Sequence, residues 1–421
     1  MNIGIIIARI GGVDGVALET EKWIEVLERL GHRVSILTGE LEREIEGVTV
    51  VEELGLYSAF SLEEQESAFH EGPLSKAGLE RLLKEHAAFL EAEIQRWVKE
   101  NELHLVVAQN LSALPCHLSA GMAVAQAAES LDIGAILHHH DFWWERGERY
   151  KSPHESVERI KRALFPPKGD RFQHVVINSY NQKRLKETHG LEATRVPNVM
   201  DFGVGFGERD DYNVDFKEEM GLDGDLSILS QVTRVVARKG IETALELVER
   251  LGDPRVRLLI TGQAVDDPGG RYLERLQRLI SKKSLEDRVL FIGHRVDHRR
   301  GTSKEGQKVY SLSDVYAHSH ACTYFSTYEG FGNAFVEACA AKTPIFVNDY
   351  QPVYWPDIGS LGFRTVMTRE GVLTEEHVNR VAEILHDERL ARRIADHNYE
   401  LAKEHFSYET LEQILSRILG D

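Results

Sequence analysis

The sequence has few cysteines and no long apolar run. Only three of its 421 residues are cysteines and none forms a CxxC pair, so neither a disulfide framework nor a structural zinc site is expected. No apolar stretch approaches the ~20 residues of a membrane helix, and no basic segment precedes the apolar N-terminus. We therefore expect no signal peptide, no stable membrane insertion and a reducing, cytoplasmic setting.

Positive charge is also scarce, because 50 Lys and Arg stand against 68 Asp and Glu, for a net charge of -18. Such a chain repels nucleic acid and anionic lipid, which excludes nucleic acid as a partner. Residues 146–190 depart from this balance, with eleven basic and five acidic side chains. We favour a solvated face balanced by acids elsewhere. The alternative is a local site for an anionic acceptor or a membrane surface.

Short apolar runs alternate with amphipathic helical stretches along nearly the whole chain, which predicts an α/β fold with parallel sheets. Five runs lie in each half, and Pro197–Gly224, rich in Gly, Asp and Asn, reads as the linker between them. We expect two Rossmann-like domains facing across a cleft, at 1–200 and 201–400, followed by a helical segment at 401–421. Ligands of such sheets bind beyond the carboxyl ends of the strands. The runs are Ile3–Ala8, Val34–Leu37, Leu105–Ala108, Ile133–Leu137, Val175–Ile177, Leu226–Leu229, Val256–Ile260, Val289–Ile292, Cys322–Phe325 and Pro344–Val347.

The most informative segment follows the Cys322–Phe325 run and opens a helix. Gly330 and Gly332 flank Phe331 and let the backbone approach a ligand, and Asn333 suits the N-cap, where free N–H groups can bind phosphate. Glu329 and Glu337 could accept hydrogen bonds from hydroxyls at both ends of one ligand. For Glu337 alone, a structural role in the first helical turn is equally open.

Two further clusters stand at predicted carboxyl ends. Arg234 and Lys239 follow the first strand of the second half, where they could neutralise a diphosphate leaving group without a metal. In the first half, the glycine loop ending at Gly15 precedes a helix and could approach a phosphate or sugar, although a plain tight turn is as consistent with it. By the same placement rule we include Gly262 and His294 on the donor side.

Three histidines, His138 to His140, follow the run Ile133–Leu137. Alternation along a strand sends His139 to the opposite face from its neighbours, which argues against a three-histidine metal site, and no metal site is predicted. A histidine here could bond a sugar hydroxyl, and aromatic rings can stack on sugars. The candidate acceptor residues are Arg9, Gln109, Asn110, Asp141, Trp144 and Arg146.

Together these motifs resemble the retaining GT-B glycosyltransferases of the group 1, or family 4, type, which include sucrose-phosphate synthase, the glycosyltransferring trehalose synthase and bacterial mannosyltransferases. Glu329 and Glu337 match the E-x7-E motif of that family, and Arg234 and Lys239 match its R-x4-K pair. The likeness covers nearly the whole chain. Lys342 departs from it, standing where a glycine is common, and residues 295–309 are longer and more polar than usual.

The resemblance implies a hexosyltransferase that moves glucose or mannose from a GDP- or UDP-hexose to a small, polar acceptor with retention. Arg234 and Lys239 would meet the leaving diphosphate, Glu337 the ribose, and Glu329 with residues 330–333 the donor sugar and phosphate. His139 or His140 would contact the sugar; the order of residues leaves both open. It further implies no required cofactor, a C-terminal helix returning to the first domain, and a monomer or homodimer.

The excess of arginine near Trp144 favours an anionic acceptor, such as a sugar phosphate or a glycerate-type acid. Pairing of these arginines with nearby acids is equally consistent with the sequence. The resemblance also includes compatible-solute synthesis, such as mannosylglucosylglycerate formation. The alternatives are a GT-B nucleotide-sugar epimerase, a peripheral glycolipid glycosyltransferase and a non-catalytic carbohydrate-binding protein on the same fold.

Overall fold

The computed structural model describes residues 1–70, 72, 74–264 and 268–420, which fall into two compact units. Unit 1 comprises Met1–Asn198 and the chain from Leu411 onward, and unit 2 comprises Val199–Thr410. The boundaries between the units thus fall after residues 198 and 410. The sequence predicts them after residues 200 and 400. The later second boundary has a physical reason, because helix α13 (Glu388–Phe406) is continuous and packs on α11 (Asn333–Ala340) within unit 2.

Unit 1 is built on a seven-stranded parallel sheet in the order β3-β2-β1-β4-β5-β6-β7. Its central strands are nearly continuous apolar runs because both faces of a parallel sheet are covered. The five apolar runs predicted here all form strands. The short edge strands β3 and β7 carry no comparable run and are missed. The strands are β1 (Asn2–Ile10), β2 (Arg33–Leu41), β3 (Val48–Val50), β4 (Leu105–Gln109), β5 (Gly134–His139), β6 (Phe172–Val176) and β7 (Ala193–Arg195).

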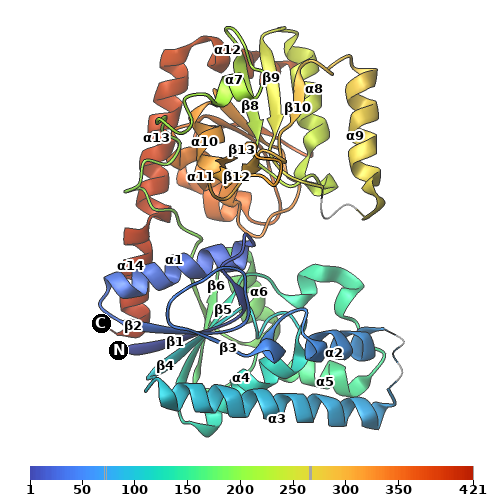
Figure 1. The fold of residues 1–421 in the computed structure, drawn as a ribbon, viewed down its shortest axis with the longest axis vertical. Coiled ribbons are helices and arrows are strands. Elements are labelled where there is room, and N and C mark those ends of the chain that lie inside the picture. The colour runs from blue at the N-terminus through green and yellow to red at the C-terminus, as the bar shows by residue number, and fades with distance from the viewer. Residues whose placement is uncertain (71, 73, 265–267, 421) are drawn as a thin grey trace. The chain divides into compact units, whose positions relative to one another are not determined.

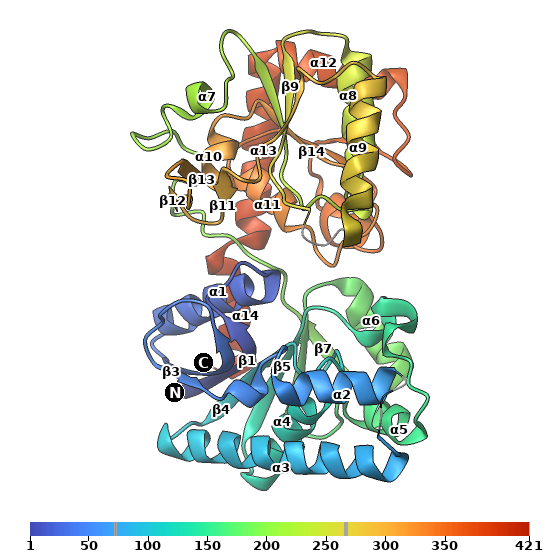
Figure 2. The same ribbon diagram turned by 45° about the vertical axis from the view of Figure 1, so that its right-hand side comes forward.

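Helices cover both faces of this sheet, with α1 on one face and α3 and α4 on the other (Figures 1 and 2). Alternate strand residues such as Ile6, Val106 and Leu137 join the core formed with α3 and α4, so their strand neighbours point to the α1 side. The helical segments are α1 (Gly15–Arg29), η1 (Glu52–Leu54), α2 (Ala59–Phe69), α3 (Lys76–Glu100), α4 (Leu118–Ser130), η2 (Trp143–Tyr150), α5 (Glu155–Leu164), α6 (Ser179–His189) and α14 (Tyr408–Leu419), the last joining unit 1 from Leu411.

Unit 2 repeats the scheme on a six-stranded parallel sheet in the order β10-β9-β8-β14-β15-β16. All five predicted runs form strands, and the missed edge strand β16 is again three residues long. Leu229 and Leu258 pack on one face against α8 and α12, and Ile228 and Leu259 pack on the other face with α7 and α10. The strands are β8 (Ser227–Gln231), β9 (Val256–Ile260), β10 (Val289–Phe291), β14 (Ala321–Tyr324), β15 (Ile345–Asn348) and β16 (Val366–Thr368).

The long polar segment after β10 forms a small sheet, β11-β13-β12, which no pattern in the sequence predicts. Its strands are β11 (Val296–Asp297), β12 (Gly301–Thr302) and β13 (Lys308–Ser311). The remaining elements of unit 2 are α7 (Phe216–Glu219), η3 (Ala237–Lys239), α8 (Ile241–Leu251), η4 (Pro268–Gly270), α9 (Arg271–Lys282), α10 (Leu312–Ala317), η5 (Tyr354–Ile358), η6 (Gly359–Leu361) and α12 (Glu375–His386), besides α11 and α13. None of the helices in the described ranges is long and apolar enough to cross a bilayer.

Candidate functional site

The loops that follow β8, β9 and β10 meet closely at the carboxyl edge of the unit 2 sheet. A side chain at Gly262 would collide with the carbonyl oxygen of Thr233, and one at Gly293 would lie 2.8 Å from the carbonyl oxygen of Gly262. Glycine is therefore required for this approach. Arg234 and His294, which adjoin Thr233 and Gly293, are both exposed. The structure thus brings Arg234, predicted to meet the leaving diphosphate, and the predicted donor residues Gly262 and His294 onto adjacent loops.

A buried ion pair joins the two predicted motifs of unit 2. Lys239, at the end of turn η3, pairs with Glu329 in the loop after β14, and both residues are less than 9% exposed. Arg238 adds a second cation, with its Nη1 3.1 Å from Glu329 Oε2 and 2.8 Å from the Tyr328 carbonyl oxygen. The backbone fixes this arrangement, since Thr327 N donates to the Arg238 carbonyl oxygen at 2.8 Å.

The electrostatics of this cluster follow from burial and proximity. Burial alone would raise the pKa of the Glu329 carboxyl, but the charges of Lys239 and Arg238 lower it below its ordinary value. Burial lowers the pKa of Lys239, and the Glu329 charge opposes that change. Sequence reasoning missed Arg238 as a site residue. The sequence does indicate it, because Arg238 is a second basic residue immediately before the lysine of the R-x4-K pair.

Helix α11 begins beside this cluster, one residue earlier than predicted. The N-cap is Gly332, in the left-handed conformation at φ +117°, and Asn333 is the first helical residue, so the assignment of Asn333 as N-cap is wrong. A side chain at position 332 would collide with Tyr350, so only glycine fits there. Glu337 lies on the helix and accepts a hydrogen bond from Tyr316 Oη at 3.1 Å. Phe331 is buried, with its ring edge-on to Phe406 at 5.5 Å.

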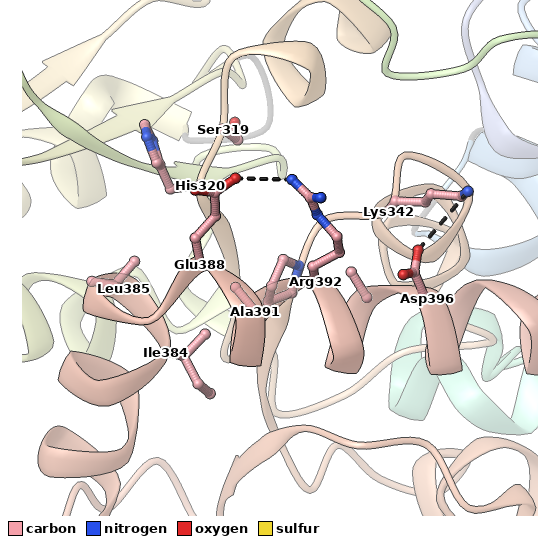
Figure 3. A pocket seen from close by; sticks show the side chains of 11 residues that line it. Ser319, His320, Lys342, Ile384, Leu385, Glu388, Ala391, Arg392 and Asp396 are labelled. Atoms are coloured by element: carbon pink, nitrogen blue, oxygen red, sulfur yellow. Dashed lines mark hydrogen bonds and ion pairs between the residues drawn. The ribbon is translucent and has the colours of Figure 1, made fainter.

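A separate cavity of about 450 Å³ lies at the other edge of the unit 2 sheet (Figure 3). His320 and Pro344 in its wall immediately precede β14 and β15, so the cavity adjoins the amino ends of the strands. Two ion pairs line it, Glu388–Arg392 at 2.9 Å and Lys342–Asp396 at 3.9 Å. The cavity contains no predicted site residue, and its charges already pair with one another.

The glycine loop of unit 1 ends in a capped helix. Asp14 is the N-cap of α1, accepting from the backbone N–H of Val16 and Ala17, and Gly15 is the first helical residue. Asp14 also pairs with Arg9, whose Nε lies 3.0 Å from its carboxylate. Arg9, predicted to bind the acceptor, therefore has a local carboxylate partner.

The three histidines alternate as predicted. His138 and His140 share one face with ring centroids 4.4 Å apart, and His138 stacks on Trp23 of α1, also at 4.4 Å. His139 lies on the other face, where its Nε2 is 3.0 Å from His174 Nδ1 on β6. Burial lowers the pKa of all three, that of His140 to about 3. No group of three or more His, Cys, Asp or Glu able to hold a metal occurs among the described residues.

Asn110 organises the loop that follows the histidines. Its Oδ1 accepts from the His140 backbone N–H at 3.0 Å, and its Nδ2 donates to Asp141 at 3.2 Å. Asp141 in turn pairs with Arg146. Trp144 stacks on Phe142 with centroids 4.2 Å apart, so one face of its ring is already covered. Gln109, one residue before Asn110, is buried.

Most basic side chains of the segment 146–190 form ion pairs. Eight of its eleven Lys and Arg side chains lie within 4.0 Å of a carboxylate, some from distant parts of the chain, such as Asp132 with Arg171. This pairing supports the interpretation of a solvated, balanced face over that of a membrane-binding surface.

Comparison with known proteins shows which family this chain resembles in sequence and fold. Residues 214–401 match the model of the family described as glycosyl transferases group 1. The chain is 32% identical to the mannosylglucosylglycerate synthase of Thermotoga maritima over 99% of both chains. It is 30% identical to the enzyme of that name from Petrotoga mobilis, over 87% of this chain and 86% of the other. Sucrose-phosphate synthase from Thermosynechococcus elongatus shares the fold, with a TM-score of 0.67 at 18% identity over 99% and 98% of the two chains.

Proposed function

The chain belongs to the group 1 glycosyltransferases of the GT-B fold, and we propose that it transfers a mannosyl group from a nucleoside diphosphate sugar to a small anionic acceptor of the glycerate class. The observation that carries the proposal is the buried Lys239–Glu329 pair with Arg238 beside the start of α11. It combines fixed cations and a carboxylate beside the N-terminus of a helix, which suit a diphosphate joined to a sugar. The names of the two relatives support mannose and a glycerate-type acceptor.

In the proposed reaction the acceptor hydroxyl oxygen bonds to the anomeric carbon as the bond from that carbon to the diphosphate breaks. Lys239, Arg238 and Arg234 stabilise the charge that develops on the leaving diphosphate. The departing phosphate oxygen takes the acceptor proton on the same face, so the configuration is retained without a dedicated base. Glu329 would hold the sugar, Glu337 the ribose, and no metal or other cofactor is required.

The test combines donors and acceptors in pairs. GDP-mannose and UDP-glucose are each incubated with glucosylglycerate and with its neutral counterpart glucosylglycerol. We expect turnover with GDP-mannose, with kcat/KM at least tenfold higher for the acid, since a hydrogen bond to a charged group contributes about 1.5–3 kcal/mol. Equal turnover of the neutral acceptor contradicts an anionic acceptor, and conversion of donor without acceptor indicates an epimerase.

Two further measurements address the mechanism. The anomeric proton coupling in the NMR spectrum of the product should show the configuration of the donor, and an inverted linkage contradicts the proposal. Activity should be unchanged after dialysis against EDTA. Loss of activity that Mg²⁺ or Mn²⁺ restores would show that the cations of unit 2 do not suffice for the leaving group.

A further inference from the structure

Three basic side chains of the segment 146–190 remain outside its ion pairs. Among the described residues, Arg149, Lys168 and Arg184 have no carboxylate within 4.0 Å. The chain has 68 Asp and Glu against 50 Lys and Arg, so unpaired cations that lie near one another are a local exception. Lys168 and Arg184 both act on the ring of His189, at the end of α6 beside β7 (Figure 2).

Aromatic rings hold the guanidinium group of Arg184 in place. Its Cζ lies 5.4 Å from the ring centroid of Trp144, and its Nη1 donates to Tyr180 Oη at 2.6 Å. In the part of the chain that the structure describes, no other group accepts a hydrogen bond from this guanidinium. A guanidinium that stacks on an aromatic ring keeps its planar N–H edge available for both oxygens of a carboxylate or phosphate.

His189 lies against the same tryptophan. Its ring centroid is 5.0 Å from that of Trp144. The Thr188 hydroxyl donates its one proton to the Arg184 carbonyl oxygen at 2.7 Å, and it therefore accepts from His189 Nδ1, also at 2.7 Å. The other ring nitrogen, Nε2, is then the atom that takes up a proton when the ring becomes charged.

The groups around His189 favour its neutral form. Burial lowers the pKa of His189, and the charges of Lys168 and Arg184 lower it further. His174 of β6 also faces this ring, but burial lowers the pKa of His174 to about 4, so it stays neutral near pH 7. An anion bound to the two cations would oppose their effect and raise the pKa of His189. The negative end of α6 disfavours an anion only within the last turn, which Arg184 precedes.

We propose that Arg184, Lys168 and His189 form a binding site for one oxyanion group, a carboxylate or a phosphate, of a small molecule. Arg184 offers two parallel N–H donors, Lys168 adds positive charge, and protonated His189 offers a further donor. The site lies within unit 1 alone, and the inference goes beyond the proposed function. The anionic acceptor of that function is one source of the oxyanion, and a separate free anion is the other.

The experiment follows the indole N–H signals of the five tryptophans by NMR while sulfate is added. Sulfate is the probe because its charge is constant near neutral pH. The Trp144 signal, identified by its absence in Trp144→Phe, should shift and saturate, since this ring contacts both Arg184 and His189. This local signal separates the site from any sulfate that binds to the cations of unit 2. A Trp144 signal that sulfate leaves unchanged overturns the proposal.

Three variants test which cations bind the anion. Arg184→Gln should weaken the sulfate affinity read from the Trp144 signal about tenfold, because it removes hydrogen bonds to a charged group. Lys168→Gln should weaken it about threefold, because an exposed cation contributes less. Lys183→Gln is the matched control, since it removes the same charge from α6 but Lys183 pairs with Glu187 at 3.8 Å; its affinity should stay within about twofold of the wild type.

Equal affinities of all three variants and the wild type refute the site. Lys168 is exposed, so Lys168→Gln should keep the wild-type melting temperature and decides the question even if Arg184→Gln fails to fold. Proton uptake at His189 gives a readout that a structural role would not move. Sulfate affinity should rise about threefold as the pH falls from about 8 to about 6, and His189→Gln should abolish the rise. An unchanged pH dependence in that variant removes His189 from the site.

Two acceptors identify the source of the oxyanion. Glucosylglycerate and its neutral counterpart glucosylglycerol are titrated in the same way. If the acid alone shifts the Trp144 signal and Arg184→Gln raises the acceptor KM about tenfold, the acceptor supplies the oxyanion. If sulfate binds and the acceptor KM is unchanged, the ligand is a separate anion. An inactive wild type contradicts the proposed function, whereas an unmoved Trp144 signal contradicts only the oxyanion site.

Discussion

The buried pair of Lys239 and Glu329 makes a quantitative prediction about energetic coupling. The perturbations are Lys239→Met, Glu329→Gln and the double substitution, all close in volume to the native side chains. In the single variants one buried charge loses its partner, whereas in the double variant neither charge remains. The free-energy cost of the double substitution should therefore be well below the sum of the two single costs.

The expected magnitudes follow from what each substitution leaves behind. Removing one partner of a buried ion pair costs about 3–5 kcal/mol. Lys239→Met should lie near the lower end, at about 3 kcal/mol, because Arg238 still pairs with Glu329 at 3.1 Å. Glu329→Gln should cost about 4 kcal/mol, because it leaves Lys239 buried beside a like charge. We expect a coupling energy of about 2–3 kcal/mol.

Urea unfolding of the four proteins at pH 7 measures the cycle, with Lys282→Met as control. Lys282 is exposed at the end of α9, and its replacement should change the free energy of unfolding by no more than about 0.5 kcal/mol. Costs that add to within about 0.5 kcal/mol would refute the reasoning, because independent sites behave in that way. The charges of Lys239 and Glu329 would then not be energetically coupled in the folded protein.

Two further predictions concern stability away from this cluster. Burial would raise the pKa of Glu64, but hydrogen bonds with His117 and His86 lower it from 4.5 to about 2, which corresponds to about 3 kcal/mol. Because the folded pKa is lowered, this stability is present above about pH 5 and is lost as the pH falls toward 2. In urea unfolding, the free energy of unfolding of Glu64→Gln should therefore fall less steeply between pH 5 and pH 2 than that of the wild type. An unchanged pH dependence contradicts the prediction. Lys342 holds φ +51° two residues after the end of α11, so the free energy of unfolding in urea should be about 1 kcal/mol higher for Lys342→Gly than for Lys342→Ala. The reverse order would argue against backbone strain at this position.

The strands that could be predicted are those with enough buried length to show an apolar run. All ten runs form strands of the two main sheets, and most of their residues are buried. The three missed strands of these sheets, β3, β7 and β16, are three residues each and lie at sheet edges. There the backbone hydrogen bonds to one neighbour decide the structure, and side-chain pattern carries little information.

The candidate site was predictable where local rules apply and not where distant partners decide. Strand alternation correctly separated His139 from His138 and His140. Asn333 was misplaced as N-cap because the chain needs φ +117° at the preceding residue, and only glycine adopts that conformation without strain. Pairings such as Arg171 with Asp132 join residues far apart in sequence, so the balance of the basic segment could not be read from its composition.

The carboxylate Glu329 has a consequence for how the proposed diphosphate site is prepared. A lysine buried alone tends to lose its proton, because burial disfavours the charged form. Glu329 opposes this tendency at Lys239, and the backbone bond between Thr327 and Arg238 fixes the second cation nearby. Two cations and one anion leave one net positive charge in the cluster. The site therefore holds its positive charge in place before a diphosphate binds, so that little reorganisation is needed as charge develops on the leaving group.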